Sequence, residues 1–185
     1  MKRIAAACLT AALAAFGAAA LAGCGPSNEE IVRQGVTEEL EAVKALDPAL
    51  LDEMAANEGL AQLAAYGIDA KEFVSSYLAG FDYRVDEVKV DGDTAQATVV
   101  LTCKSFNAFA TGFTEAVTAL SADESVPNMG DEEVDQLIGQ TVMDTLAAVE
   151  PTETAPVTLA FELKDNVWSP TAEAEQVITE ALFGN

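Results

Sequence analysis

Residues 81–103, FDYRVDEVKVDGDTAQATVVLTC, decide the fold. Apolar and polar residues alternate on both sides of Asp91-Gly92, and a period of two is typical of a strand with one buried face. Asp-Gly between two such runs is a strong signal for a tight hairpin turn. The alternation changes parity after Val85, which predicts a β-bulge near Asp86-Glu87. We therefore expect an antiparallel hairpin over residues 81–103.

Helical patterns flank the hairpin on both sides. Apolar residues recur three and four positions apart, which is the spacing of one helix face. Asn28, Asp47, Asp69 and Asp131 each precede such a run and can act as N-terminal caps. The predicted helices cover residues 28–43, 47–67, 69–80, 106–120, 131–149 and 171–183.

Two further strands are expected near the C-terminus. Residues 157–163 alternate strictly between apolar and polar side chains, and Lys164-Asp165-Asn166 predicts a turn before Val167-Trp168. The strands cluster instead of alternating with helices, so an α+β fold is preferred over α/β. The prediction is N-terminal helices and a curved antiparallel sheet, built on the hairpin plus late strands over residues 157–168.

The first residues have the pattern of a secretory signal. Lys2 and Arg3 precede an uncharged, apolar run that ends in Leu21-Ala22-Gly23-Cys24. This quartet resembles the lipobox of bacterial lipoproteins. The resemblance implies that Cys24 receives a diacylglyceryl thioether and becomes the first residue after cleavage. A retained transmembrane helix is the alternative, but the run ends in Gly-Cys-Gly-Pro without a charged flank.

These signals divide the chain into three parts: a signal peptide over residues 1–23, a lipidated tether over residues 24–27 and one α+β domain over residues 28–185. A diacylglyceryl group carries two acyl chains, and two chains give stable membrane attachment where one is marginal. We therefore expect a protein anchored at the outer face of the cell membrane.

The negative net charge and the absence of histidine exclude several classes of function. The chain has 31 acidic and 9 basic residues, for a formal charge of −22, and removing Lys2 and Arg3 would lower it to −24. Binding to nucleic acid needs a basic surface, so it is not expected. The chain has no His, which excludes Ser-His-Asp and Cys-His catalysis and His-ligated metals.

No cofactor or dedicated metal site is expected. Asp91-Gly92-Asp93 has acidic ligands but lacks the loop spacing of an EF-hand. Weak, collective binding of divalent cations by the net charge is expected instead. Of the three cysteines, Cys8 leaves with the signal peptide and Cys24 is the acylation site. Cys103 shares strand parity with Leu101, which favours a buried core thiol.

A broader resemblance concerns the domain. Phe81-Asp82-Tyr83-Arg84-Val85, the turn over residues 90–95 and Val167-Trp168-Ser169 resemble small bacterial lipoproteins with a cystatin-like or NTF2-like domain. The resemblance covers residues 81–168 and implies a curved sheet wrapped on helices. Two helices over residues 107–149 depart from the usual NTF2-like order.

Aromatic residues supply the candidate binding site. A pocket between sheet and helices, suited to a small apolar ligand, would be lined by Tyr77, Tyr83, Phe109, Phe113 and Trp168. The same residues at these spacings also suit a plain hydrophobic core.

Two functions therefore remain open. The first is a lipid-anchored, non-enzymatic binding or interaction module, with an envelope protein or a small apolar ligand as its partner. The alternative is a small NTF2-like hydrolase or isomerase that uses carboxylates as acid and base. Asp82 and Tyr83 are adjacent on a strand and point to opposite faces, so they cannot share a pocket. A filled core would favour the first function, and an enclosed cavity the second.

Overall fold

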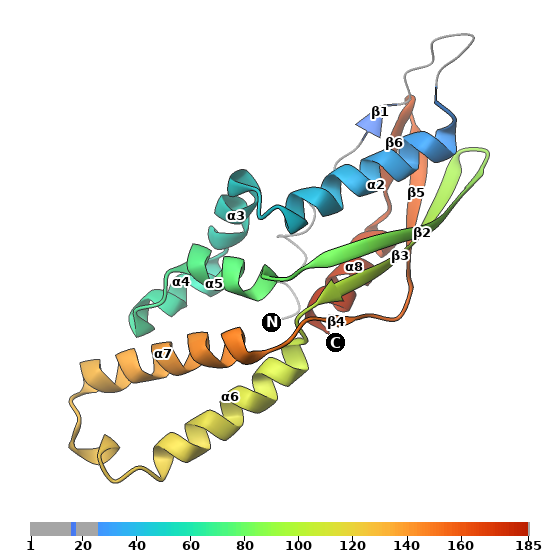
Figure 1. Cartoon of the computed structure of the whole chain (residues 1–185). Coiled ribbons are helices and arrows are strands. Elements are labelled where there is room, and N and C mark those ends of the chain that lie inside the picture. The colour runs from blue at the N-terminus through green and yellow to red at the C-terminus, as the bar shows by residue number, and fades with distance from the viewer. Residues whose placement is uncertain (1–15, 18–25, 185) are drawn as a thin grey trace.

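The hairpin predicted over residues 81–103 forms in the computed structural model, which describes residues 16–17 and 26–184 (Figure 1). Strand β2 (Asp82–Asp91) pairs antiparallel with β3 (Thr94–Cys103). Gly92 in the turn has a φ of +59°, a left-handed conformation that glycine adopts without steric cost. The register shifts between Val85 and Glu87, so the predicted β-bulge is confirmed.

The late strands extend the sheet along the other edge of β3. Strand β5 (Val157–Lys164) pairs with β3, and β6 (Val167–Pro170) pairs with β5, both antiparallel. Asp165 and Asn166 between them have φ values of +53° and +61°. Two successive residues with positive φ give a two-residue hairpin loop, and Asn and Asp tolerate this conformation better than other side chains.

Two short strands are not indicated by the sequence pattern. Strand β4 (Thr152–Glu153) pairs with the end of β3, and β1 (Phe16–Gly17) pairs with β6. The strand order is β1-β6-β5-β3-β2, with β4 beside β3. β1 lies inside the predicted signal peptide, whereas the lipobox and Cys24 lie outside the described residues.

The helices agree with the predicted α+β fold. They are α2 (Asn28–Lys44), α3 (Pro48–Ala55), α4 (Glu58–Ala61), the 3₁₀ turn η1 (Gln62–Tyr66), α5 (Ala70–Leu78), α6 (Phe106–Ser121), the 3₁₀ turn η2 (Val126–Asn128), α7 (Asp131–Ala148) and α8 (Ala172–Phe183). Within residues 16–17 and 26–184, no helix combines the length and the hydropathy that spanning a bilayer requires.

The helix starts follow local capping, with two corrections. Ser27, not Asn28, caps α2, because its hydroxyl accepts from Glu30 N while the Glu30 carboxylate accepts from Ser27 N at 2.7 Å. These hydrogen bonds hold the pKa of Glu30 below its usual value. Gly130, not Asp131, is the cap of α7. Asp47 and Asp69 cap α3 and α5 as predicted.

The single helix predicted over residues 47–67 is wrong. The chain there forms α3, α4 and η1 in succession. α3 ends because Asn57 leaves the helical conformation and its side chain accepts from Gly59 N at 2.9 Å, which starts a new helix. Gly67, with a φ of +72°, ends η1 in the left-handed conformation typical of helix C-termini.

One face of the sheet is covered by α2 and α8. Tyr83 on β2 contacts the Thr37 carbonyl of α2, and Cys103 on the same face of β3 lies 3.8 Å from the Ala181 carbonyl of α8. The fully buried side chains on or against this face include Trp168, Phe161, Leu101, Leu159 and Ile178. Cys103 is buried, which confirms it as a core residue.

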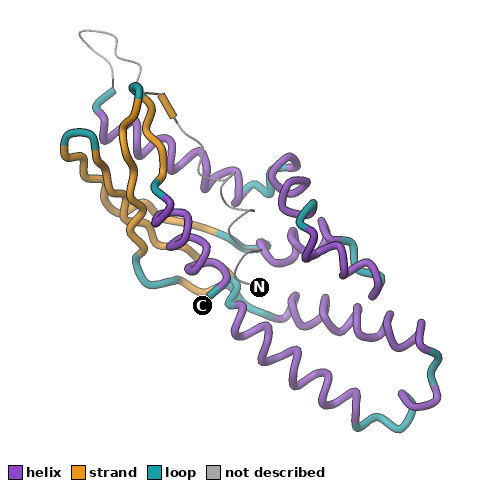
Figure 2. The backbone as a smooth tube through the Cα atoms, turned by 180° about the vertical axis from the view of Figure 1, so that it is seen from behind, coloured by secondary structure: helices purple, strands orange, loops and turns teal. Residues whose placement is uncertain are grey.

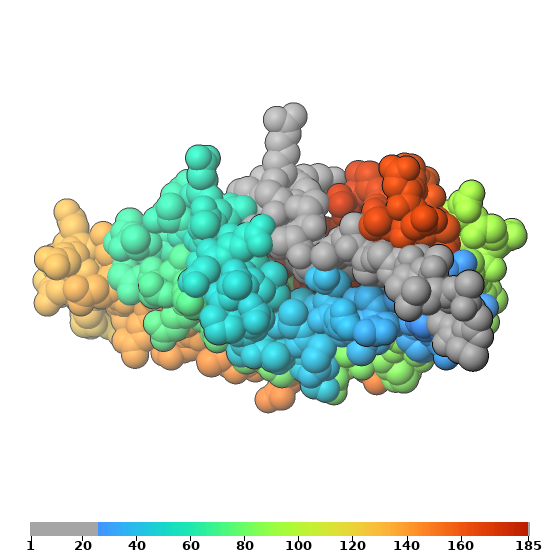
Figure 3. All heavy atoms as spheres, turned by 90° about the horizontal axis from the view of Figure 1, so that it is seen from above, coloured from blue at the N-terminus to red at the C-terminus, as the bar shows by residue number. Residues whose placement is uncertain are grey.

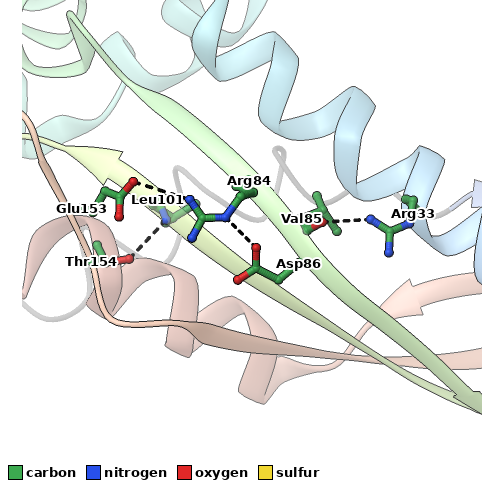
Figure 4. Close-up of polar contacts among 7 residues, drawn as sticks. All are labelled: Arg33, Arg84, Val85, Asp86, Leu101, Glu153 and Thr154. Carbon is green, nitrogen blue, oxygen red and sulfur yellow. Dashed lines mark hydrogen bonds and ion pairs between the residues drawn. The ribbon is translucent and has the colours of Figure 1, made fainter.

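The opposite face of the sheet is mainly polar, although Val100, which pairs with Arg84 on this face, is buried. At the bulge, Arg33 on α2 donates to the Val85 carbonyl oxygen at 2.9 Å (Figure 4). On the open face, Arg84 binds Asp86 at 2.6 Å and reaches Glu153 on β4 at 3.5 Å. The bulge is thus held from the α2 side and flanked by an ion pair.

Gly139 fixes α7 against η1. A Cβ built on Gly139 would collide with the backbone carbonyl of Tyr66. We expect Gly139→Ala to lower the free energy of unfolding by about 1–3 kcal/mol, because the close approach must open. Gln140→Ala, at the exposed neighbouring position, is the control and should be neutral or slightly stabilising. Urea denaturation checks both, and equal effects would contradict the packing role of Gly139.

Candidate functional site

The structure distributes the five predicted pocket residues over four elements. Phe109 and Phe113 lie on α6, Tyr77 lies on α5, and Tyr83 and Trp168 lie on β2 and β6, strands that are not neighbours in the sheet. The rings of Phe109 and Phe113 stack, with centroids 6.1 Å apart. A shallow depression of about 460 Å³ near the β2–β3 turn is lined by other residues, among them Lys89, Gln96 and Glu162.

Tyr77 and Trp168 are core residues. The Tyr77 hydroxyl donates to the Leu182 carbonyl at 2.7 Å, and its ring stacks on Phe183 with centroids 5.3 Å apart. Burial raises the pKa of Tyr77. Trp168 is fully buried, and its Nε1 has no hydrogen-bond partner. Both side chains therefore fill space between sheet and helices, which fits the structural alternative for these residues.

Tyr83 belongs to a polar cluster between α2 and β2. Its hydroxyl lies 3.1 Å from Glu41 Oε2, and the Lys44 ammonium lies 5.9 Å from its ring centroid. Lys44 also forms an ion pair with Asp82 at 2.9 Å. This lysine of α2 therefore contacts two adjacent residues of β2, Asp82 and Tyr83. Burial and the Glu41 hydrogen bond raise the pKa of Tyr83. The cluster is part-exposed, and its contacts join α2 to the start of β2.

The carboxyl groups with shifted pKa values do not suggest a general acid. Lys44 donates to Asp82, Tyr83 N donates to the same group, and the pKa of Asp82 is lowered. Hydrogen bonds from Ser125 lower the pKa of Asp123 in the same way. Hydrogen bonds to the charged carboxylate stabilise it and explain why both pKa values are lowered. A carboxyl group that acts as a general acid at neutral pH needs a raised pKa.

The Lys44–Asp82 pair makes stability depend on pH. Because the pKa of Asp82 is lower in the folded protein, the pair stabilises the fold above the unfolded value of about 3.9. Its contribution is lost as the pH falls through the lower folded value. We expect Lys44→Met to be less stable than the parent protein at pH 7 in urea denaturation, with the difference narrowing in stronger acid. Asp82→Asn in the Lys44→Met background should add no pH-dependent loss, and a gap that widens in acid would contradict the pairing.

The α6 stripe is an apolar row that is exposed at Phe106 and half-buried along the rest of its length. It comprises Phe106, Phe109, Phe113, Val117 and Leu120, which share one face of α6. The rings form a row, with centroids of Phe106 and Phe109 6.1 Å apart, and Phe73 of α5 meets Phe109 edge-on at 6.4 Å. Phe106 is 37% exposed, and no residue of α6 is fully buried. Glu115 is the single charged residue in this 16-residue helix.

α6 and α7 form an arm, residues 106–148, that extends beyond the sheet (Figure 2). α6 packs mainly on α7, where a Cβ on Gly112 would lie 3.1 Å from Thr145 Cγ2. α7 also packs on α5 and η1. The fully buried residues of α7 are Gly139 and Leu146, so the arm has almost no core of its own. The apolar side chains between α6 and its neighbours therefore stay half-buried.

The arm is also uniformly acidic. Residues 106–148 include eight acidic residues and no basic residue. No ion pair between described residues involves an arm carboxylate. Elsewhere, five of the seven basic residues after Cys24 form the described ion pairs, and Arg33 and Lys104 bind backbone carbonyls. Every described basic side chain is therefore already engaged.

Lys104 fixes the base of the arm, and the sequence analysis missed it. It is 5% exposed, and its ammonium donates to the Leu146 carbonyl at 2.7 Å. This carbonyl lies in the last turn of α7, where the helix dipole favours a cation. Burial lowers the pKa of Lys104. Nothing in the sequence distinguishes it from a surface lysine.

Metal ligands are not assembled in the described part of the chain. Within residues 16–17 and 26–184, no group of three or more Asp, Glu or Cys side chains is placed to hold a metal ion. The expectation of weak, collective binding of divalent cations therefore stays a prediction.

Comparisons with known proteins give one structural similarity. No protein-family model matches the sequence, and no curated protein matches it. Among solved structures, the chain is similar to one described as a "putative lipoprotein (ycdA)" of Bacillus subtilis subsp. subtilis str. 168, with 12% sequence identity and a TM-score of 0.46. The match covers 80% of this chain and 46% of that chain. This chain thus spans about half the length of that protein.

Proposed function

We propose that this protein is a lipid-anchored, non-enzymatic interaction module that binds a partner protein through the α6 stripe at the outer face of the cell membrane. The observation that carries the proposal is the stripe itself: a row of aromatic side chains on a nearly uncharged helix, part-exposed in a chain of formal charge −22. Phe106 is exposed and the other stripe residues are half-buried. A partner that covers this remaining apolar surface on so acidic a chain is the explanation that we propose.

The position of the arm supports a protein partner over the membrane. Cys24 is two residues before Pro26, so its Cα lies within about 8 Å of the described chain. α2 begins at one end of the molecule, and the turn between α6 and α7 lies at the other end (Figure 1). The space-filling view shows the same separation (Figure 3). An anchor on Cys24 would therefore hold the arm away from the bilayer.

Removal of the predicted signal peptide, residues 1–23, would expose a sheet edge that is protected against unwanted pairing. Cleavage before Cys24 would remove β1 and open the outer edge of β6. β6 has only four residues and ends in Pro170. Short strands and proline are common protections of an exposed sheet edge against unwanted pairing. The edge is thus suited to a mature protein that lacks residues 1–23.

The filled core supports an interaction module over the enzyme alternative. Leu101, Phe161 and Trp168 are fully buried on the covered face of the sheet, where the predicted pocket between sheet and helices would lie. The shifted carboxyl pKa values of Glu30, Asp82 and Asp123 all lie below their usual values, in the direction opposite to a general acid. The cystatin-like or NTF2-like domain type stays a prediction.

Cys24→Ala tests the anchor. We expect the parent protein to fractionate with membranes and to carry a diacylglyceryl mass on an N-terminal Cys24, and the variant to lose both, because the thiol is the acylated group. Cys103→Ala is the matched control, since it removes a buried thiol in the core and should leave membrane retention unchanged. An intact residue 1–23 segment in the parent protein would contradict the anchor.

Site-specific crosslinking tests the interaction. A photoreactive amino acid in place of Phe106 should give a discrete crosslink to another protein in intact cells, because this side chain is exposed on the stripe. The same amino acid in place of Asp93, at the exposed β2–β3 turn, is the control and should not give that product. Identical products from both positions, or none from position 106, would contradict binding through the α6 stripe.

A further inference from the structure

We infer that the outer edge of β6 is an acceptor for an extended, uncharged segment of another protein once the leader, residues 1–23, has been removed. The basis is that a strand of the leader itself is seated on this edge. Phe16 of β1 lies opposite Trp168 of β6, and Gly17 lies opposite Val167. The inference goes beyond binding through the α6 stripe, and it rests on the proposed function only for cleavage before Cys24.

The acceptor lies between a strand and a helix. β1 is beside both β6 and α2, and α2 also packs on β2 and β3 toward the other edge of the sheet (Figure 1). The sheet therefore curves around α2, and β1 occupies the place where its last strand returns to the helix. Removal of β1 leaves unpaired backbone groups of β6 on one side and α2 on the other. A segment that enters there gains main-chain hydrogen bonds from the strand and contacts with the helix, which is recognition by strand addition.

The two outer edges of the sheet differ in their protection. Once β1 is removed, the outer strands are β2 and β6. In β2, six of the ten residues are charged and a bulge interrupts the ladder, and both features discourage pairing with another chain. β6 has no charged residue, and its four-residue length and Pro170 limit the pairing to a short segment, such as the two residues of β1. The β6 edge therefore accepts a strand, but only a short one.

Trp168 gives a second observation. Its side chain is fully buried, and its indole Nε1–H has no hydrogen-bond partner among the described residues. A buried donor without an acceptor is costly, so an unsatisfied group of this kind requires an explanation. The donor belongs to the residue opposite β1. A bound segment that supplies a carbonyl or hydroxyl oxygen to this donor would therefore bind more tightly than the leader does.

Charge favours an uncharged segment of a different protein over a second copy of this chain. Without the two basic residues of the leader the formal charge falls from −22 to −24, so two processed copies brought edge to edge repel each other. β6 offers no charged side chain that would pair with a charged segment, and β1 is itself uncharged. The occupant of the edge is therefore an extended, uncharged segment.

The fluorescence of Trp168 tests whether the edge opens. Trp168 is the single tryptophan of the chain, so its emission reports on this strand alone. The chain purified as the cell processes it is compared with uncleaved Cys24→Ala in the same detergent. We expect emission at longer wavelength and stronger quenching by acrylamide in the processed chain, because loss of β1 uncovers the residue opposite it. Equal spectra from chains that mass spectrometry shows to be cleaved and uncleaved would overturn the inference.

A peptide with the sequence of the seated segment tests binding. The probe is residues 10–20 of this chain, TAALAAFGAAA, with a neutral ethylene-glycol tail for solubility. We expect it to bind the processed chain and to shift the Trp168 emission back to shorter wavelength. It should leave uncleaved Cys24→Ala unaffected, because β1 holds the edge there. The peptide with Phe16→Pro and Gly17→Pro should bind at least tenfold more weakly, because proline has no N–H for the ladder.

Variants of the processed chain locate the binding. Val167→Lys puts a charge on the edge and should weaken peptide binding about tenfold, because charged edge residues disfavour strand addition. Thr158→Lys is the matched control, since it adds the same charge at an exposed position of β5, a strand paired along both edges, and should leave binding unchanged. Circular dichroism melts establish that each variant is folded, and Ser169→Lys on the same strand replaces Val167→Lys if that variant does not fold.

The outcomes separate this inference from the proposed function. Equal binding of the proline peptide, or equal loss of binding in Val167→Lys and Thr158→Lys, would show nonspecific attachment of an apolar peptide and overturn the inference. A dimer of the processed chain in analytical ultracentrifugation that Val167→Lys abolishes would assign the edge to a second copy and also overturn it. In each case a crosslink from position 106 would still support the interaction through the α6 stripe. Retention of residues 1–23 in the cell would remove the vacant edge and the anchor together, but not that crosslink.

Discussion

β3 pairs along both of its edges, with β2 on one side and with β4 and β5 on the other. Its alternate side chains Ala95, Ala97, Val99 and Leu101 are all buried beneath the helices that cover the sheet. A strand with both edges paired and one face buried has a fixed register, since a slip of one residue would turn its apolar set to solvent. The placement of α2, α8 and the arm all depends on this register.

The arm begins where β3 ends, and its base is buried. Cys103 and Lys104 are both buried, and Lys104 joins the end of the strand to the last turn of α7. Toward the turn between α6 and α7 the packing is less extensive, because α6 packs mainly on α7 and contains no fully buried side chain. The molecule thus combines a filled sheet layer with a partly covered helical hairpin. This gradient explains why the arm is the surface proposed for a partner.

The charged residues are also distributed differently between the sheet layer and the arm. The few basic residues after Cys24 are engaged in the sheet, in α2, in α5 and at the base of the arm, where they pair with carboxylates or bind carbonyls. The arm keeps its acidic residues without compensation. Self-repulsion of this kind weakens compact packing.

The sequence by itself determined the hairpin with its bulge, the α+β class, the buried Cys103 and the caps at Asp47 and Asp69, because each depends on residues within a few positions of one another. The tertiary structure alone decided how the predicted pocket residues were divided. Tyr77 and Trp168 joined the core, whereas Phe109 and Phe113 remained on the arm, because identical helical spacing does not say which neighbour covers a face. The same holds for the division of residues 47–67, where Asn57 closes one helix, and for the burial of Lys104 against a carbonyl that is 42 residues away in the chain.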